Sequence, residues 1–165
     1  MSNVRSLVAV SWNSLICTPD AEALGELRSS WSWLLSSPIE PVLFSIFGDV
    51  FFRAGSETVY WLNTGTGEIA KVSETMAEFQ DLLGSEKSAE WFLPALVEKL
   101  HAAGKVPASG QCYTYAVLPV FAEGKFEEWN FNPVPVREHF SVTAKVLKEI
   151  ADLPNGARVR LSVVE

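Results

Sequence analysis

The sequence predicts an α+β fold with a mostly antiparallel central sheet of four to six strands and three or four helices packed around it. Apolar and β-branched runs of strand length follow one another between residues 42 and 72, separated by Gly, Ser, Thr and Asn. Two helical patterns come next, and further strand-like runs begin near residue 111. Consecutive strands followed by helices are typical of α+β proteins and not of a regular β-α alternation.

The first helix is expected from residue 21 to residue 36. Asp20 stands at the N-cap position, and Pro38 ends the pattern. The apolar residues at helical spacing are Leu24, Leu27, Trp31, Leu34 and Leu35. Before this helix the sequence is ambiguous, with one run at residues 7–10 that has the composition of a short strand.

The middle of the chain predicts three sheet strands. Residues 42–53 are apolar on both faces, which is typical of an inner strand. Gly48 interrupts this run and indicates a bulge or a close backbone approach. Residues 58–63 alternate as the hairpin partner, and residues 68–72 follow as the next strand after a turn.

Two helices are then expected, at residues 75–83 and 87–103. Thr75 and Glu78 have the spacing of a capping box, and Gly84 stops the first helix. Pro94 falls inside the second helix, where it predicts a kink or the restart of a shorter helix.

The C-terminal third predicts two strands, a helix and a last strand. Residues 111–120 have the pattern of a central strand, and residues 127–135 carry two prolines, which suits an edge strand or an irregular loop. Ser141 is the expected cap of a helix that runs to residue 151. A final strand is expected at residues 157–164.

Length and composition favour one cytoplasmic domain over residues 1–165. Residues 1–44 are expected to complete the main core, because so short a segment seldom makes a core of its own. The chain holds only Cys17 and Cys112, which favours buried thiols in a reducing compartment over a disulfide scaffold. We expect no signal peptide and no membrane span, because each apolar run is broken well short of the length that a span needs.

Charge argues against nucleic-acid binding. The chain carries 20 acidic and 13 basic residues and a formal net charge of −7. A protein that holds phosphates needs clustered Lys and Arg, so no nucleic acid is expected as a partner. An acidic surface suits a basic protein partner, although solubility alone also explains such a balance.

The sequence predicts no catalytic, cofactor-binding or metal site. His101 and His139 stand apart, without the cluster that a metal needs. Cys112 is expected to be buried and inert in a strand. The glycines of Gly65-Thr66-Gly67 lack the third glycine and the following helix of a phosphate cradle.

Asp49 is the anomalous residue, because it lies inside an apolar run. A carboxylate there must be satisfied by backbone or basic partners, or face a cleft. It serves either as the anchor of a turn or bulge beside Gly48 or as a functional group.

Five short stretches, taken in order, resemble one bacterial family. They are Phe47-Gly48-Asp49-Val50-Phe51-Phe52, Val59-Tyr60-Trp61-Leu62, Phe79 with Leu83, Gly110-Gln111-Cys112-Tyr113, and His139-Phe140 followed by Leu153-Pro154-Asn155-Gly156. In this order and spacing the chain resembles the C-terminal-domain family of type VI secretion DNase-immunity proteins, over residues 45–163. Residues 1–44 do not resemble the separate N-terminal domain of the longer immunity proteins.

The resemblance implies a non-enzymatic bacterial protein that binds and neutralises a toxin. A nuclease toxin tends to be basic, because it holds DNA phosphates, so an acidic inhibitor gains electrostatic steering. The candidate partner-binding residues are Asp49, Glu74, Glu78, Asp81, Glu86, Glu90 and Trp129. Tyr60, Trp91 and Trp129 are candidate aromatic anchors, although such residues more often lie in a core.

Two other classes of function remain open at this point. One is a scaffold or regulatory module with a different protein partner. The other is a small-ligand binder or hydrolase that uses Asp49, Cys112 and His139.

Overall fold

The computed structural model describes residues 10–154 and residue 156. Its strands form a four-stranded antiparallel sheet in the order β1-β2-β3-β4 and a two-stranded sheet, β5-β6. The strands are β1 (Glu40–Phe44), β2 (Val50–Arg53), β3 (Val59–Leu62), β4 (Ile69–Ser73), β5 (Gln111–Tyr115) and β6 (Phe131–Pro135). The predicted α+β fold is therefore confirmed. The strand expected at residues 157–164 and all but the last residue of the run at 7–10 lie outside the described residues.

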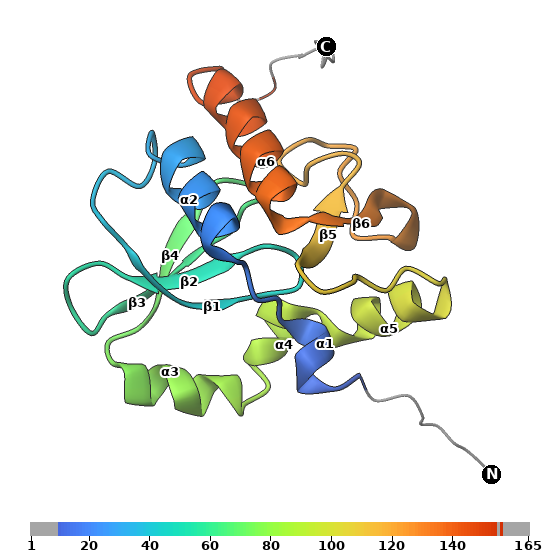
Figure 1. The fold of residues 1–165 in the computed structure, drawn as a ribbon, viewed down its shortest axis with the longest axis horizontal. Coiled ribbons are helices and arrows are strands. Elements are labelled where there is room, and N and C mark those ends of the chain that lie inside the picture. The colour runs from blue at the N-terminus through green and yellow to red at the C-terminus, as the bar shows by residue number, and fades with distance from the viewer. Residues whose placement is uncertain (1–9, 155, 157–165) are drawn as a thin grey trace.

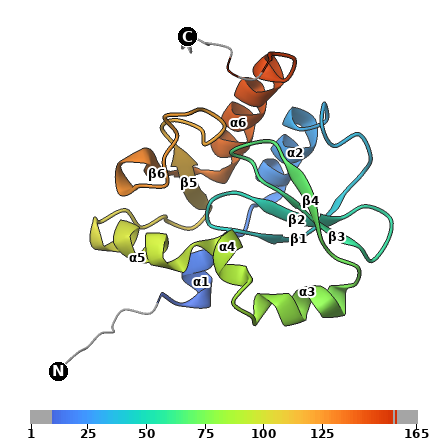
Figure 2. The ribbon, with the colours of Figure 1, turned by 180° about the vertical axis from the view of Figure 1, so that it is seen from behind.

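Helices cover both faces of the four-stranded sheet. They are α1 (Trp12–Leu15), α2 (Ala21–Ser30), α3 (Met76–Leu83), α4 (Ser88–Phe92), α5 (Pro94–Ala102) and α6 (Val136–Ile150), with a short 3-10 helix, η2 (Glu128–Asn130). Helices α2 and α6 lie side by side over one face, whereas α3 and α4 lie on the other side of the sheet (Figures 1 and 2). The β5-β6 sheet lies beside α6.

The inner strand β2 is buried on both faces, as its apolar sequence predicts. Val50 and Phe52 belong to the core cluster under α2 and α6. Phe51 points to the opposite face, where it packs with Phe79 and Trp91. Alternation of side chains along the strand thus supplies one core on each side of the sheet.

The expectation of one strand over residues 42–53 is wrong. The chain turns at residues 45–49 and returns as β2, antiparallel to β1. Gly48 has a positive φ of 82°, and the Ser45 hydroxyl accepts hydrogen bonds from the backbone N–H groups of Phe47 and Asp49, each at 3.2 Å. The irregularity in the β1-β2 pairing lies between Pro41 and Leu43 instead of at Gly48.

The expected helix starts at Asp20, Thr75 and Pro94 are confirmed, whereas the expected end of the first helix is wrong. The side chain of Asp20 accepts from the N–H of Ala23 at the start of α2, and Thr75 accepts from Glu78 N–H at the start of α3. The helix expected at residues 87–103 restarts at Pro94, after Leu93 in the left-handed region. Helix α2 ends six residues earlier than expected, at Ser30.

The C-terminal half departs further from expectation. The predicted strand at residues 111–120 is shorter, and it pairs with β6 in a separate sheet instead of lying in the centre of the main one. Helix α6 begins five residues before Ser141, directly after β6. Its buried stripe already starts at Val136, and the Val136 N–H is satisfied by the carbonyl of Gly110. His139, which precedes the expected cap at Ser141, therefore lies inside the helix.

Part of the N-terminal segment packs into the main core. Ala23, Leu27 and Trp31 belong to the same buried cluster as Phe140 and Leu147 of α6. The Trp31 indole N–H donates to the Phe140 carbonyl at 3.1 Å.

Candidate functional site

A small cavity lies where β3, α4 and the end of β5 meet, and aromatic rings form most of its wall. Its volume is about 200 Å³. We call it the aromatic cavity, and it is lined by Phe47, Asp49, Trp61, Asn63, Glu90, Trp91, Leu93, Tyr115 and Phe126. Pockets for drug-sized ligands usually measure about 300–1,000 Å³. This cavity therefore suits one side chain or a small ion.

Two pairs of rings build the wall from distant parts of the chain. Trp61 on β3 and Trp91 on α4 have ring centroids 6.5 Å apart. Tyr115, at the end of β5, meets Phe126 edge to face at 6.2 Å. Phe126 comes from the loop between β5 and η2, and it is 49% exposed, so it forms part of the rim.

Asp49 is a buried carboxyl group in the cavity wall, with 4% of its surface exposed. Its Oδ1 accepts hydrogen bonds from the N–H and the hydroxyl of Thr64, at 2.9 and 3.1 Å. Within the described chain, no donor makes a hydrogen bond of normal geometry to Oδ2. Burial raises the pKa of the Asp49 carboxyl from 3.8 to about 7. The Thr64 hydrogen bonds and the nearby Trp61 N–H act in the other direction and lower this pKa. That indole N–H is buried and has no normally aligned acceptor.

The hydroxyl of Thr64 links Asp49 to a buried histidine. His139 Nε2 lies 2.8 Å from Thr64 Oγ1, and His139 Nδ1 lies 2.8 Å from Thr114 Oγ1. Burial lowers the pKa of His139 from 6.5 to about 3, so its ring is neutral at pH 7. With the ring proton on Nε2, Thr64 accepts from His139 and donates to Asp49, while Nδ1 accepts from Thr114. Asp49 thus anchors the turn beside Gly48, one of the two roles that its sequence context allowed.

Of the three residues of the hydrolase alternative, Asp49 and His139 share the Thr64 hydroxyl, and Asp49 acts electrostatically on the Cys112 thiol, but the three do not form a nucleophile and base. Cys112 is completely buried, and the nearby Cys17 and Asp49 reinforce burial in raising the pKa of its thiol well above the ordinary value. Both nitrogens of His139 are taken by threonine hydroxyls. A protonated thiol without a base at hydrogen-bond distance is a poor nucleophile. The cluster therefore lacks the arrangement that nucleophilic catalysis needs.

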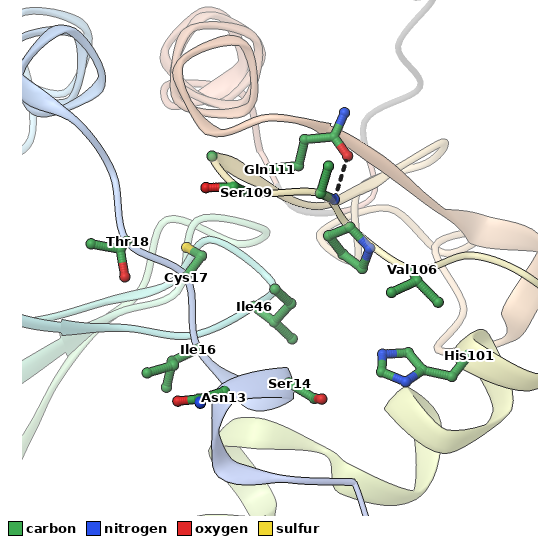
Figure 3. A pocket seen from close by; sticks show the side chains of 13 residues that line it. Asn13, Ser14, Ile16, Cys17, Thr18, Ile46, His101, Val106, Ser109 and Gln111 are labelled. Atoms are coloured by element: carbon green, nitrogen blue, oxygen red, sulfur yellow. Dashed lines mark hydrogen bonds between the residues drawn. The ribbon is translucent and has the colours of Figure 1, made fainter.

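A larger cavity, of about 310 Å³, lies between α1 and the loop that follows α5. Figure 3 shows Cys17 and His101 on opposite walls of this cavity, with Ile46 between them. The Cys17 thiol donates to the Ser45 carbonyl at 3.3 Å, and burial raises its pKa to about 12. His101 lies in the last turn of α5, near the negative end of the helix dipole. No hydrogen bond joins Cys17 and His101 within the described residues.

The five predicted carboxylates at residues 74–90 are all exposed. We call this part of the surface the acidic segment, and its members are Glu74, Glu78, Asp81, Glu86 and Glu90. They lie at the end of β4, on α3, and around the start of α4, on one side of the sheet (Figure 1). Lys71 pairs with Glu74 at 2.8 Å and Lys87 with Glu90 at 3.4 Å. The described chain contains no ion pair of the other three.

The structure brings together only some of the sequence-predicted site residues. Glu90 belongs to the acidic segment and also lines the aromatic cavity with Asp49. Trp129 is exposed on η2, and its indole N–H donates to Glu127 at 2.8 Å. Strand β6, which directly follows η2, lies well apart from α3 in Figures 1 and 2, so η2 is separated from most of the acidic segment.

The other two candidate anchors have different surroundings. Trp91 is a core residue with 3% of its surface exposed, and it also contributes to the cavity wall. Tyr60 is partly buried and stacks on Phe52 with centroids 5.7 Å apart. Sequence reasoning missed Tyr115 and Phe126, because nothing in the sequence shows that these segments meet Trp61.

The described residues contain neither a metal-ligand cluster nor a membrane-spanning helix. No three or more His, Cys, Asp and Glu side chains are grouped so that they could hold a metal ion. No helix in residues 10–154 has both the length and the apolar character needed to cross a membrane.

Comparison with known protein families finds no family that matches this chain, and comparison with curated proteins finds no match either. Among solved structures, the chain is similar to that of Atu4351 from Agrobacterium tumefaciens, with a TM-score of 0.49 and 14% sequence identity. The match covers 79% of this chain and 65% of that chain, so the chain spans less than two thirds of that protein's length.

Proposed function

We propose that this protein is a binding protein of the immunity type, which binds and neutralises a basic toxin, with a nuclease effector of type VI secretion as the expected target. The observation that carries the proposal is the acidic segment. Five exposed carboxylates lie within 17 residues, and Lys71 and Lys87 are the only cations paired with them in the described chain. The sequence resemblance to DNase-immunity proteins supports the same function.

The physical basis of the proposal is electrostatic steering. A nuclease that holds DNA phosphates presents a basic surface, and the acidic segment presents the complementary charge. Such complementarity raises association rates and excludes partners of the wrong charge more than it adds to equilibrium affinity. Side chains of α3 are well placed for this role because the helix packs on the sheet through Phe79 and leaves its carboxylates exposed.

The first test is binding and protection. Calorimetry of the purified protein against the toxin encoded by the neighbouring gene should show a one-to-one complex, and co-expression should protect cells from that toxin. If neither binding nor protection is observed, the proposal is wrong.

The second test separates the acidic segment from net charge. A variant with Glu78→Gln, Asp81→Asn and Glu86→Gln should associate with the toxin about tenfold more slowly at low salt and show a weaker salt dependence. The matched control is Glu123→Gln, Glu138→Gln and Glu149→Gln, which changes net charge equally at exposed positions elsewhere. Equal effects of the two variants would show that only total charge matters and would remove the acidic segment from the interface.

A further inference from the structure

We propose that the aromatic cavity binds an organic cation, with Asp49 as the buried counter-ion and Glu90 as a second carboxylate at the opening. The ligand chemistry is that of a guanidinium, an ammonium or a quaternary ammonium group. Such a group is carried by an Arg or Lys side chain of a protein partner or by a free small amine. This inference does not depend on the toxin proposal.

The wall of the cavity has the composition of a cation site. Five of its nine lining residues are aromatic, two are carboxylates, and none is basic. A cation within about 6 Å of an aromatic ring centroid is attracted by the negative face of the ring, most strongly by that of Trp. Trp61 and Trp91, with centroids 6.5 Å apart and planes at 55°, both line this one small space.

Asp49 lines this space, and its only partner in the described chain besides Thr64 is a nearby Trp61 N–H without normal alignment. Thr64 occupies Oδ1 with two hydrogen bonds, whereas Oδ2 has no normally aligned donor within the described chain. A buried carboxylate without a counter-ion is costly, and a cation in the cavity would offset that cost. Glu90 is paired with Lys87 at 3.4 Å, with both side chains largely exposed, so a ligand displaces only a weak contact there.

The volume fits a charged group of modest size. A cavity of about 150 Å³ accommodates benzene, so about 200 Å³ has room for a guanidinium or trimethylammonium group with part of its stem. Phe126 lies at the rim and is about half exposed, so a ligand enters beside it.

Cation binding at Asp49 should depend on pH. The groups around this carboxyl are Cys17, Cys112, Tyr115, His139 and, across the cavity, Glu90. The pKa values of both thiols and of Tyr115 are raised, to about 12 for Cys17, and that of His139 is lowered to about 3. Asp49 has a pKa of about 7 and therefore titrates near neutrality. Below pH 7 the cation must displace a proton, so affinity should fall about tenfold per pH unit.

The test is a titration followed by two-dimensional NMR, with the indole N–H signals of Trp61 and Trp91 assigned through single Trp→Phe variants. Methylguanidinium and tetramethylammonium should shift the Trp61 signal at millimolar concentration, and tert-butanol, an uncharged probe of similar size, should not. Blocked arginine amide distinguishes the source of the ligand. If it binds as well as methylguanidinium, the cavity receives a partner's side chain; if it is excluded, the cavity receives a free amine.

Variants complete the test. Asp49→Asn should weaken cation binding at least tenfold, and Glu90→Gln should weaken it severalfold, whereas Glu86→Gln, an exposed carboxylate outside the cavity, should have no effect. Glu90→Gln keeps the test valid if Asp49→Asn fails to fold. Equal shifts with tert-butanol, or equal effects of Glu86→Gln and Glu90→Gln, would overturn the proposal. These outcomes are independent of toxin binding.

Discussion

Asp49 and His139, 90 residues apart in the sequence, are joined through a single hydroxyl group. Thr64 Oγ1 lies 3.1 Å from Asp49 Oδ1 and 2.8 Å from His139 Nε2. Burial moves their pKa values in opposite directions, to about 7 for the acid and about 3 for the imidazole. At neutral pH the core therefore holds an uncharged imidazole beside a carboxyl group that is close to its own pKa.

This pair predicts two opposite pH dependences of stability. Between about pH 4 and pH 7, folded Asp49 keeps a proton that the unfolded chain releases, so its contribution to the free energy of unfolding falls as pH rises. Between about pH 3 and pH 6.5, the unfolded chain protonates His139 and the folded chain does not, so this contribution rises with pH. Over the shared range the two effects oppose each other, each by up to about 1.4 kcal/mol per pH unit.

Urea unfolding at pH 4.5, 5.5 and 6.5 separates the two groups. Relative to the wild type, Asp49→Asn should gain stability as pH rises, because the acid's unfavourable ionisation is gone. His139→Gln should lose stability relative to the wild type over the same range. Parallel pH profiles for both variants would contradict the assigned protonation states.

Gly48 predicts a large cost for the smallest substitution. A Cβ at this position would lie 2.3 Å from Cδ2 of His139, whose ring is held on both sides by threonine hydroxyls. Gly55 is the matched control, since its φ of 83° is almost the same and no atom lies within 4 Å of the added carbon. Gly55→Ala should cost about 1–2 kcal/mol through backbone strain alone. Gly48→Ala should cost about 1–3 kcal/mol more, measured by denaturant unfolding. Similar losses in the two variants would show that the ring yields without cost.

Asn130 predicts a local effect on the loop that carries Phe126. Its completely buried side chain accepts from Val117 N–H at 2.7 Å and donates to the carbonyls of Val117 and Lys125, each at 2.9 Å. Asn130→Ala leaves these backbone groups without partners, at a cost of about 1–3 kcal/mol. Hydrogen exchange should accelerate in residues 116–127 and stay unchanged in β2 and β3. The exposed Asn132→Ala is the control and should change stability by less than about 0.5 kcal/mol. Faster exchange throughout the chain would indicate a global role instead.

Local signals in the sequence were sufficient for many of the secondary-structure elements. The caps at Asp20 and Thr75, the restart at Pro94 and the doubly apolar strand β2 depend on groups within a few residues of one another. Their physical causes are therefore present in any short window of the chain. The α+β class follows from the order of these elements.

Where long-range contacts compete with local pattern, the sequence alone was misleading. The run at residues 42–53 has strand character throughout, but the Ser45 hydroxyl accepts backbone hydrogen bonds that close part of it into a turn. Strand β5 stabilises this turn, because the Tyr113 N–H donates to the Ile46 carbonyl at 2.7 Å. Helix α6 starts before the expected cap at Ser141, because Val136 directly follows β6 and is buried in the core. Neither contact is visible in a local window.

The sequence by itself determined that Asp49 is a charged residue in an apolar run and that the region from Glu74 to Glu90 is rich in carboxylates. Both features depend only on residues that are neighbours in the sequence. Only the tertiary structure decided what surrounds Asp49. Thr64, His139, Trp61, Trp91 and Tyr115 come from separate elements, and packing of α4 and β5 against the sheet places them around one carboxyl group. Burial then sets its pKa, since desolvation depends on every segment that excludes water from the site.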